Sequence, residues 1–223
     1  MEKTEKIEDI NICKQCGGRC CKKCGCDYSA LDFDDLSYKT ICEFLSEGKI
    51  SVVSMVSFDR LSNGKKIANL FLYLRARNVD RDVVDLISVK TRCSQLTEIG
   101  CSYTYDDRPT GGKNLVPVEG GKCYPAEDQF ELVKTWQPYQ NVLRKVVKRY
   151  TGKSVENKAR EDAENLFYRV FCDDFDEAMP EELLDLRTFV PALQQAYPDE
   201  AKKAFLRYNS HKCKVLNTLQ SQK

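Results

Sequence analysis

One short stretch of the chain, residues 13–26, reads CKQCGGRCCKKCGC and contains six of the twelve cysteines. Thiols at this density are held in a fold as disulfides, as metal ligands or as redox groups. The chain begins MEKTEKIEDI, which mixes charges of both signs and lacks the apolar run of an export signal. No later stretch approaches the roughly 18 apolar residues of a membrane span. We therefore expect a cytoplasmic protein without a membrane partner, whose clustered cysteines bind metal.

The spacing inside this stretch indicates which sulfurs are ligands. Cys13 and Cys16 are separated by two residues, which lets two sulfurs of one tight turn bind the same ion. The side chains of Cys20 and Cys21 are adjacent, so they diverge and need not bind one ion. Cys21 and Cys24 are separated by two residues, as Cys13 and Cys16 are. The predicted ligands of this first group are Cys13, Cys16, Cys20, Cys21 and Cys24. The spacing leaves the role of Cys26 open.

The single histidine, His211, restricts the chemistry of any metal site. Hydrolytic zinc sites and the facial triad of iron oxygenases need two or three imidazoles, which this chain cannot supply. A metal would therefore be held by thiolates. Thiolate ligation is typical of structural zinc and of iron–sulfur clusters, including the 4Fe–4S type. The sequence predicts zinc or iron as the cofactor and does not choose between them.

A second group of cysteines follows in a segment rich in glycine and proline, and it comprises Cys93, Cys101 and Cys123. Loops without regular hydrogen bonding are places where a metal can substitute for a core. We expect these three cysteines to approach the first group in space and to complete its coordination. The sequence is consistent with one composite site and with two neighbouring sites.

The two groups together resemble a known cysteine-cluster family, described as zinc- or iron-chelating, which includes the flagellin lysine N-methylases. The resemblance covers roughly residues 13–125 and rests on Cys13-x-x-Cys16, Cys20-Cys21, Cys93-Ser-Gln-Leu, Gly100-Cys101 and Arg108-Pro109. Its usual pattern is Cys-x-x-Cys-x-x-Cys-Cys, then Cys-Pro-x-Leu, Gly-Cys and Arg-Pro-x-x-Cys. This chain departs from it by one extra residue before Cys20, by Ser94 in place of proline and by Gly112 in place of the last cysteine. We expect Cys123, followed by Tyr124-Pro125, to take over that ligand role.

Composition restricts the class of partner. The chain has 35 Lys and Arg against 34 Asp and Glu, a net charge of +1. Binding to nucleic acid phosphates needs a basic excess or a concentrated basic patch, so we expect no nucleic acid partner. The short runs Lys22-Lys23, Lys65-Lys66 and Lys148-Arg149 are interpreted as solvated faces. With 42% hydrophobic residues the chain can bury a core.

The residue pattern predicts an α+β fold, with a metal-stapled cysteine-cluster domain at 1–125 that holds a small antiparallel sheet, and a helical region at 126–223. Strands are expected at 50–58 and 67–74, with Asn63-Gly64 as their turn, and an extended run at 83–88. Helices are expected at 31–48 from an Asp32 N-cap to Gly48, at 130–150 with a break at Pro138 and a stop at Gly152, from Ser154, near Pro180, near Pro191, and at 198–219.

Three functions remain open from the sequence. The first is a metal-binding protein with an all-thiolate site that is structural or carries electrons. The second, implied only by the resemblance, is an iron–sulfur-dependent enzyme that methylates a protein lysine; its catalytic residues are unknown. The third is a metal-stabilised module that binds a protein partner. The candidates for chemistry near the cysteines are Asp106, Asp107 and Arg108, and Tyr103 or Tyr105. The interpretation of each as a turn or packing residue is favoured over a chemical role. Cys42, Cys172 and Cys213 are interpreted as structural.

Overall fold

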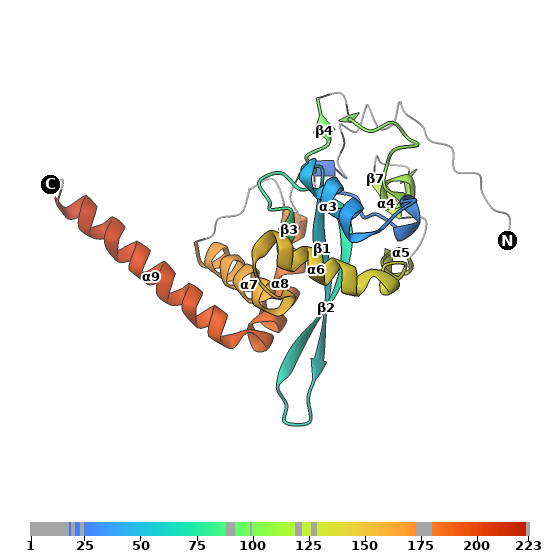
Figure 1. Cartoon of the computed structure of the whole chain (residues 1–223). Helices are drawn as coiled ribbons and strands as arrows, with labels where there is room; N and C mark the ends of the chain where they lie inside the picture. The colour runs from blue at the N-terminus through green and yellow to red at the C-terminus, as the bar shows by residue number, and fades with distance from the viewer. Residues whose placement is uncertain are drawn as a thin grey trace. The chain divides into compact units, whose positions relative to one another are not determined.

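The computed structural model describes residues 18, 21–22, 25–87, 92–98, 100–118, 122–125, 129–172 and 180–221, of which 116–118, 122–125, 129, 180–187 and 213–221 are described by their backbone alone. In chain order (Figure 1) the elements are η1 (Ala30–Asp32), α3 (Tyr38–Ser46), β1 (Ile50–Arg60), β2 (Lys66–Ala76), β3 (Val84–Asp85), β4 (Leu96–Thr97), β5 (Gly100–Cys101), α4 (Thr110–Lys113), β6 (Leu115–Val118), β7 (Lys122–Pro125), α5 (Gln129–Lys134), η2 (Gln137–Tyr139), α6 (Gln140–Thr151), α7 (Val155–Cys172), α8 (Pro180–Ala196) and α9 (Pro198–Ser221).

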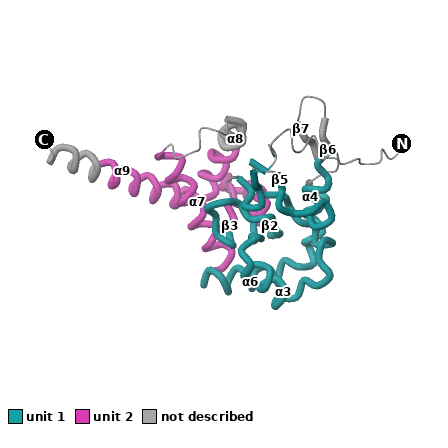
Figure 2. Tube along the Cα trace, turned by 90° about the horizontal axis from the view of Figure 1, so that it is seen from above, with its two compact units in different colours: residues 1–53, 72–85, 90–152 teal, residues 54–71, 86–89, 153–223 magenta. Residues whose placement is uncertain are grey.

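The chain forms two compact units, coloured in Figure 2, and it passes between them more than once. The first unit comprises residues 1–53, 72–85 and 90–152, and the second comprises residues 54–71, 86–89 and 153–223. The boundary falls inside both β1 and β2. The described fold is α+β, as the sequence predicts.

The main sheet has the strand order β2-β1-β3. Strands β1 and β2 form the predicted hairpin, whose turn includes Gly64 at φ +80°, a conformation that glycine adopts without strain. Strand β3 pairs in parallel with β1, with Val52 opposite Val84. The predicted purely antiparallel sheet is therefore wrong in this detail: after β1 and β2 the chain returns in the direction of β1. The pairs β4-β5 and β6-β7 are antiparallel.

The core of the first unit lies where α3, α5 and α6 meet the bases of β1 and β2. Its fully buried side chains include Ile41, Leu45, Val52, Leu72, Leu74, Trp136 and Leu143. Phe33 joins aromatic neighbours on both sides, because its ring centroid lies 5.2 Å from that of Phe44 and 5.9 Å from that of Trp136. The predicted stop at Gly152 is confirmed: this residue adopts φ +68° and its N–H bonds to the Lys148 carbonyl.

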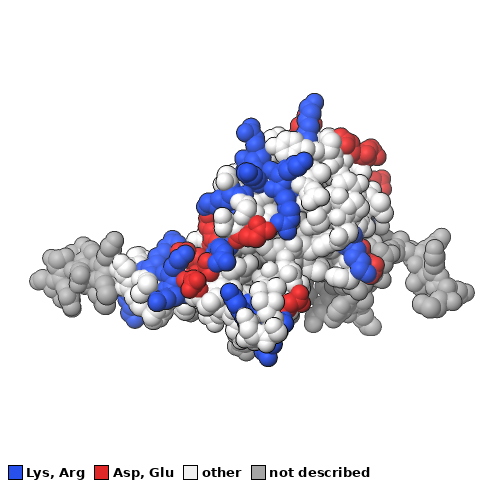
Figure 3. Space-filling model, turned by 60° about the horizontal axis from the view of Figure 1, so that its bottom comes forward, with Lys and Arg blue, Asp and Glu red and all other residues white. Residues whose placement is uncertain are grey.

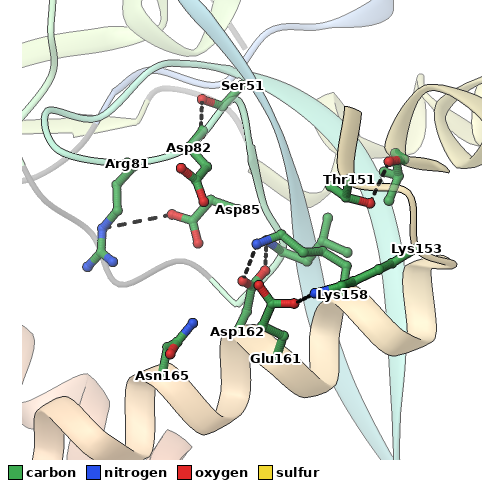
Figure 4. A network of polar contacts seen from close by, with 12 residues as sticks. Ser51, Arg81, Asp82, Asp85, Thr151, Lys153, Lys158, Glu161, Asp162 and Asn165 are labelled. Atoms are coloured by element: carbon green, nitrogen blue, oxygen red, sulfur yellow. Dashed lines mark hydrogen bonds and ion pairs between the residues drawn. The ribbon is translucent and has the colours of Figure 1, made fainter. Parts of the chain in front are cut away.

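The second unit is built on α7, which packs against α9. One face of α7 is buried at Val155, Ala159, Ala163 and Phe167, and Val170 is half-buried. Lys158 and Asp162, one helical turn apart, form a buried ion pair with Nζ and Oδ1 2.6 Å apart (Figure 4). The other carboxylate oxygen of Asp162 accepts the Leu86 N–H at 2.8 Å. None of the helices in the described part of the chain combines the length and the apolar character needed to span a bilayer.

Three predicted helix features need correction. Asp32 does not cap a helix at 31–48; Ser29 caps η1 and Ser37 caps α3, because each hydroxyl accepts a backbone N–H of the turn that follows. The two helices predicted near Pro180 and Pro191 are one helix, α8, with Pro191 inside it. Proline removes one hydrogen bond from the helix, and the helix continues on both sides.

Two aromatic residues of these helices are partly exposed. Phe130 on α5 and Phe205 on α9 both keep 49% of their surface, whereas Ala204 beside Phe205 is fully buried. Because neighbouring residues of a helix are about 100° apart around the axis, a shift of one residue is enough to move a side chain out of the core.

Candidate metal centre

The segment that follows the first cysteine group, residues 25–28, is anchored on the edge of β2. The Ala76 N–H donates to the Cys26 carbonyl at 2.9 Å, and the Tyr28 N–H donates to the Leu74 carbonyl at 3.0 Å. Gly25 makes this approach possible, since a Cβ on it would lie 1.8 Å from the Ala76 carbonyl oxygen. The sheet therefore fixes the position of Cys26.

A buried ion pair reinforces this anchor. Asp27 forms an isolated antiparallel bridge with Arg75, and the Arg75 Nε donates to Asp27 Oδ1 at 2.6 Å. Both side chains are buried, with 8% of Arg75 and 4% of Asp27 exposed. Trp136 completes the arrangement, because its indole N–H donates to the Tyr28 carbonyl at 2.7 Å.

The second cysteine group meets the first through the main chain. The Cys93 N–H donates to the Cys21 carbonyl at 2.7 Å, and the Ser94 N–H donates to the Arg77 carbonyl at 2.8 Å. Cys93 also forms an isolated bridge with Asn78. The Asn78 side chain in turn accepts the Gly25 N–H at 2.7 Å. These contacts tie residues 21, 25, 78 and 93 into one small framework.

Cys101, at the end of β5, adds a third thiol to this framework. Its side chain shares a hydrogen bond with that of Cys21, which is the main reason why the pKa of Cys101 falls to about 6. The Tyr103 backbone N–H and the Arg108 guanidinium lower that pKa further, and burial opposes them. Cys101 is therefore stabilised as a thiolate, the form that binds metal.

The environment of Cys21 and Cys93 also suits sulfur ligands. Cys21 keeps 8% of its surface and Cys93 keeps 4%, so both thiols are buried. The Gln95 N–H donates to Cys93 Sγ at 3.4 Å. Backbone N–H groups aimed at sulfur, together with a nearby guanidinium, offset the negative charge of clustered thiolates. These contacts suit sulfur in the thiolate form.

Cys26 lies close to Gly112, a contact that the sequence does not predict. A Cβ built on Gly112 would lie 3.0 Å from the Cys26 sulfur. Gly112 is the position at which the resemblance expects a cysteine, and the Cys26 sulfur lies beside it. Helix α4, which carries Gly112, is held by two contacts: the Gly111 N–H donates to the Asp27 carbonyl at 2.9 Å, and the Thr110 N–H donates to an Asp32 carboxylate oxygen at 2.9 Å.

The polar residues near the second cysteine group make different contacts. Arg108 contacts Cys101 and lies over the Tyr105 ring, with its guanidinium carbon 5.9 Å from the ring centroid. The Tyr28 hydroxyl donates to the Tyr103 hydroxyl at 3.5 Å, and burial is the main cause of the raised pKa of both phenols. Asp107 accepts the Thr104 hydroxyl at 2.5 Å and stabilises the turn.

The structure thus joins Cys21 to two other predicted ligands: its carbonyl accepts the Cys93 N–H, and its side chain shares a hydrogen bond with that of Cys101. The other predicted ligands, Cys13, Cys16, Cys20, Cys24 and the side chain of Cys123, lie outside the described residues. Among the side chains that are described, no group of three or more from His, Cys, Asp and Glu is placed so that it could hold a metal ion. Cys42 on α3 and Cys172 on α7 are both half-buried.

Comparison of the chain with protein-family models, with curated protein sequences and with solved structures finds no match.

Proposed function

We propose that the chain binds a metal through thiolates, either as a zinc ion or as an iron–sulfur cluster, with ligands from both cysteine groups. The observation that carries this proposal is the convergence of Cys21 with Cys93 and Cys101. Cys21 is distant in the sequence from the other two; a main-chain hydrogen bond joins it to Cys93, and a side-chain hydrogen bond joins it to Cys101. The predicted ligands Cys13, Cys16, Cys20, Cys24 and Cys123 would complete the set.

Chemistry supports the same proposal. Buried thiols that approach one another gain little unless a cation or a disulfide links them, and a buried thiolate is costly unless it is neutralised. Arg108 supplies one positive charge to Cys101, and a metal would supply the rest. Zinc would crosslink the two cysteine groups, whereas an iron–sulfur cluster would also carry an electron.

The test is metal analysis of protein purified without oxygen. Zinc predicts a colourless protein with one or two equivalents of zinc, and an iron–sulfur cluster predicts broad visible absorption with stoichiometric iron and sulfide. Cys21→Ser and Cys101→Ser should lower the metal content by half or more, whereas the matched variants Cys42→Ser and Cys172→Ser should keep it. Equal metal content in all four variants would show that these sulfurs are not ligands.

A further inference from the structure

Helix α6 of the first unit carries a dense basic face. Its inner face is buried at Leu143, Val146 and Val147. Its outer face exposes four cations within six residues, Arg144, Lys145, Lys148 and Arg149, and the helix contains no Asp or Glu. Figure 3 shows Lys and Arg side chains gathered on one region of the molecular surface.

Three of the four cations of α6 differ from those cations of other helices that pair with carboxylates. Lys39 pairs with Glu43 on α3, and Lys134 pairs with Glu131 on α5. Within the described part of the chain, Lys145, Lys148 and Arg149 have no carboxylate partner. Lys145 and Arg149 are also one helical turn apart, where like charges repel. An anion bound to this face would offset the repulsion and stabilise the helix.

Two exposed tyrosines lie at the end of this face. Tyr150 keeps 37% of its surface and Tyr38 keeps 41%. The Tyr150 hydroxyl donates to the Cys42 carbonyl at 2.7 Å, which fixes the ring while leaving part of it open. Burial raises the pKa of Tyr150, and Tyr38 adds to this rise while Arg149 opposes it, so all three groups are neighbours.

We propose that the outer face of α6, with Tyr38 and Tyr150, binds single-stranded nucleic acid. Phosphates would lie against the cations, which extend over about 7.5 Å of the helix axis, more than one phosphate needs. Unpaired bases would stack on the exposed rings. The near-zero net charge of the chain does not oppose this, because α6 is the concentrated basic patch that phosphate binding requires.

Other anionic partners fit this surface less well. A membrane-binding helix inserts its apolar face into lipid, but the apolar face of α6 is buried in the core of the unit. An acidic protein segment would use the cations and leave the two rings without a role. The proposal is independent of the metal centre and can fail without affecting it.

The test is fluorescence anisotropy with a labelled single-stranded oligonucleotide of about 16 nucleotides. Replacing Lys145, Lys148 and Arg149 together by glutamine should weaken binding at least about tenfold and should lower the slope of log Kd against log salt by about 2, at roughly 0.7 per phosphate contact. The matched control removes three exposed cations elsewhere, with Lys65→Gln, Lys202→Gln and Lys203→Gln in one protein, and should bind as the parent does.

Tyr38→Ala tests the stacking separately. It should weaken binding of the oligonucleotide about fivefold or more and leave binding of an abasic strand of equal length unchanged. Parent-like binding by the triple α6 variant would overturn the proposal. So would equal affinity for duplex DNA or for polyglutamate, because either result would show that the face only attracts negative charge.

Discussion

Removing the Asp27 carboxylate should destabilise the first unit strongly. Asp27→Ala leaves the Arg75 guanidinium in a buried position without the carboxylate oxygen that now lies 2.6 Å from its Nε. Breaking a buried ion pair in this way costs about 3–5 kcal/mol. Typical domains are stable by only about 5–15 kcal/mol, and with a urea slope of about 1–3 kcal/mol per molar the midpoint should fall by at least about 1 M.

The assay is urea unfolding followed by the fluorescence of Trp136. It is the only tryptophan of the chain and it is fully buried. Because its indole N–H bonds to the carbonyl of Tyr28, next to Asp27, its emission reports the unit in which the change is made. The double variant Asp27→Ala/Arg75→Met should recover about 2 kcal/mol or more, because neither charge is then buried without the other.

A matched control is Glu43→Ala, which breaks the exposed pair with Lys39, where the two side chains keep 86% and 61% of their surface. Its effect should stay within about 0.5 kcal/mol. The reasoning is refuted if Asp27→Ala changes stability by less than about 1 kcal/mol. It is also refuted if the losses in the two single variants simply add in the double variant.

Three further predictions follow from the same structure. Gly25→Ala should destabilise by at least about 2 kcal/mol in thermal unfolding, because its Cβ would overlap the Ala76 carbonyl, whereas Gly152→Ala, with open space but φ +68°, should lose only about 1 kcal/mol. Lys158→Met should lose about 3 kcal/mol by leaving the Asp162 carboxylate buried without its cation, and a loss under 1 kcal/mol by denaturant titration would contradict this. Removing the metal with a strong chelator should lower the melting temperature read by tryptophan fluorescence; an unchanged value in a verified metal-free sample would refute a structural role for the metal.

The features that the sequence predicts correctly depend on local backbone chemistry. The hairpin follows from β-branched runs on either side of Asn63-Gly64, and Gly64 has the positive φ that such a turn requires. Gly152 ends α6 in the left-handed conformation for the same reason. Ser154 begins α7 as predicted, because its hydroxyl accepts the Asn157 N–H.

The features that the sequence misses depend on contacts between distant residues. Aspartate is a common N-cap residue, but the Asp32 carboxylate accepts hydrogen bonds from the Ser29 N–H and the Thr110 N–H instead. The parallel pairing of β3 with β1 depends on the path of the chain after β2. Of the centre, spacing alone indicates Cys21, Cys93 and Cys101, but it cannot show that main-chain bonds join Cys21 to Cys93. The sequence alone does not indicate the basic face of α6, because Arg144-Lys145 and Lys148-Arg149 are two separate short runs along the chain. In a helix, residues four apart lie on the same face, so the two pairs form one group.

The contact between Cys26 and Gly112 shows how a residue distant in the sequence restricts the side chain that position 112 can carry. The Cys26 backbone cannot withdraw, because its carbonyl bonds to Ala76 and the next residue, Asp27, is held by Arg75. A side chain at position 112 would have its Cβ 3.0 Å from the Cys26 sulfur and 3.4 Å from the Cys26 Cβ. A cysteine at 112 and one at 26 would therefore compete for the same space. Glycine at 112 leaves this space to the Cys26 sulfur.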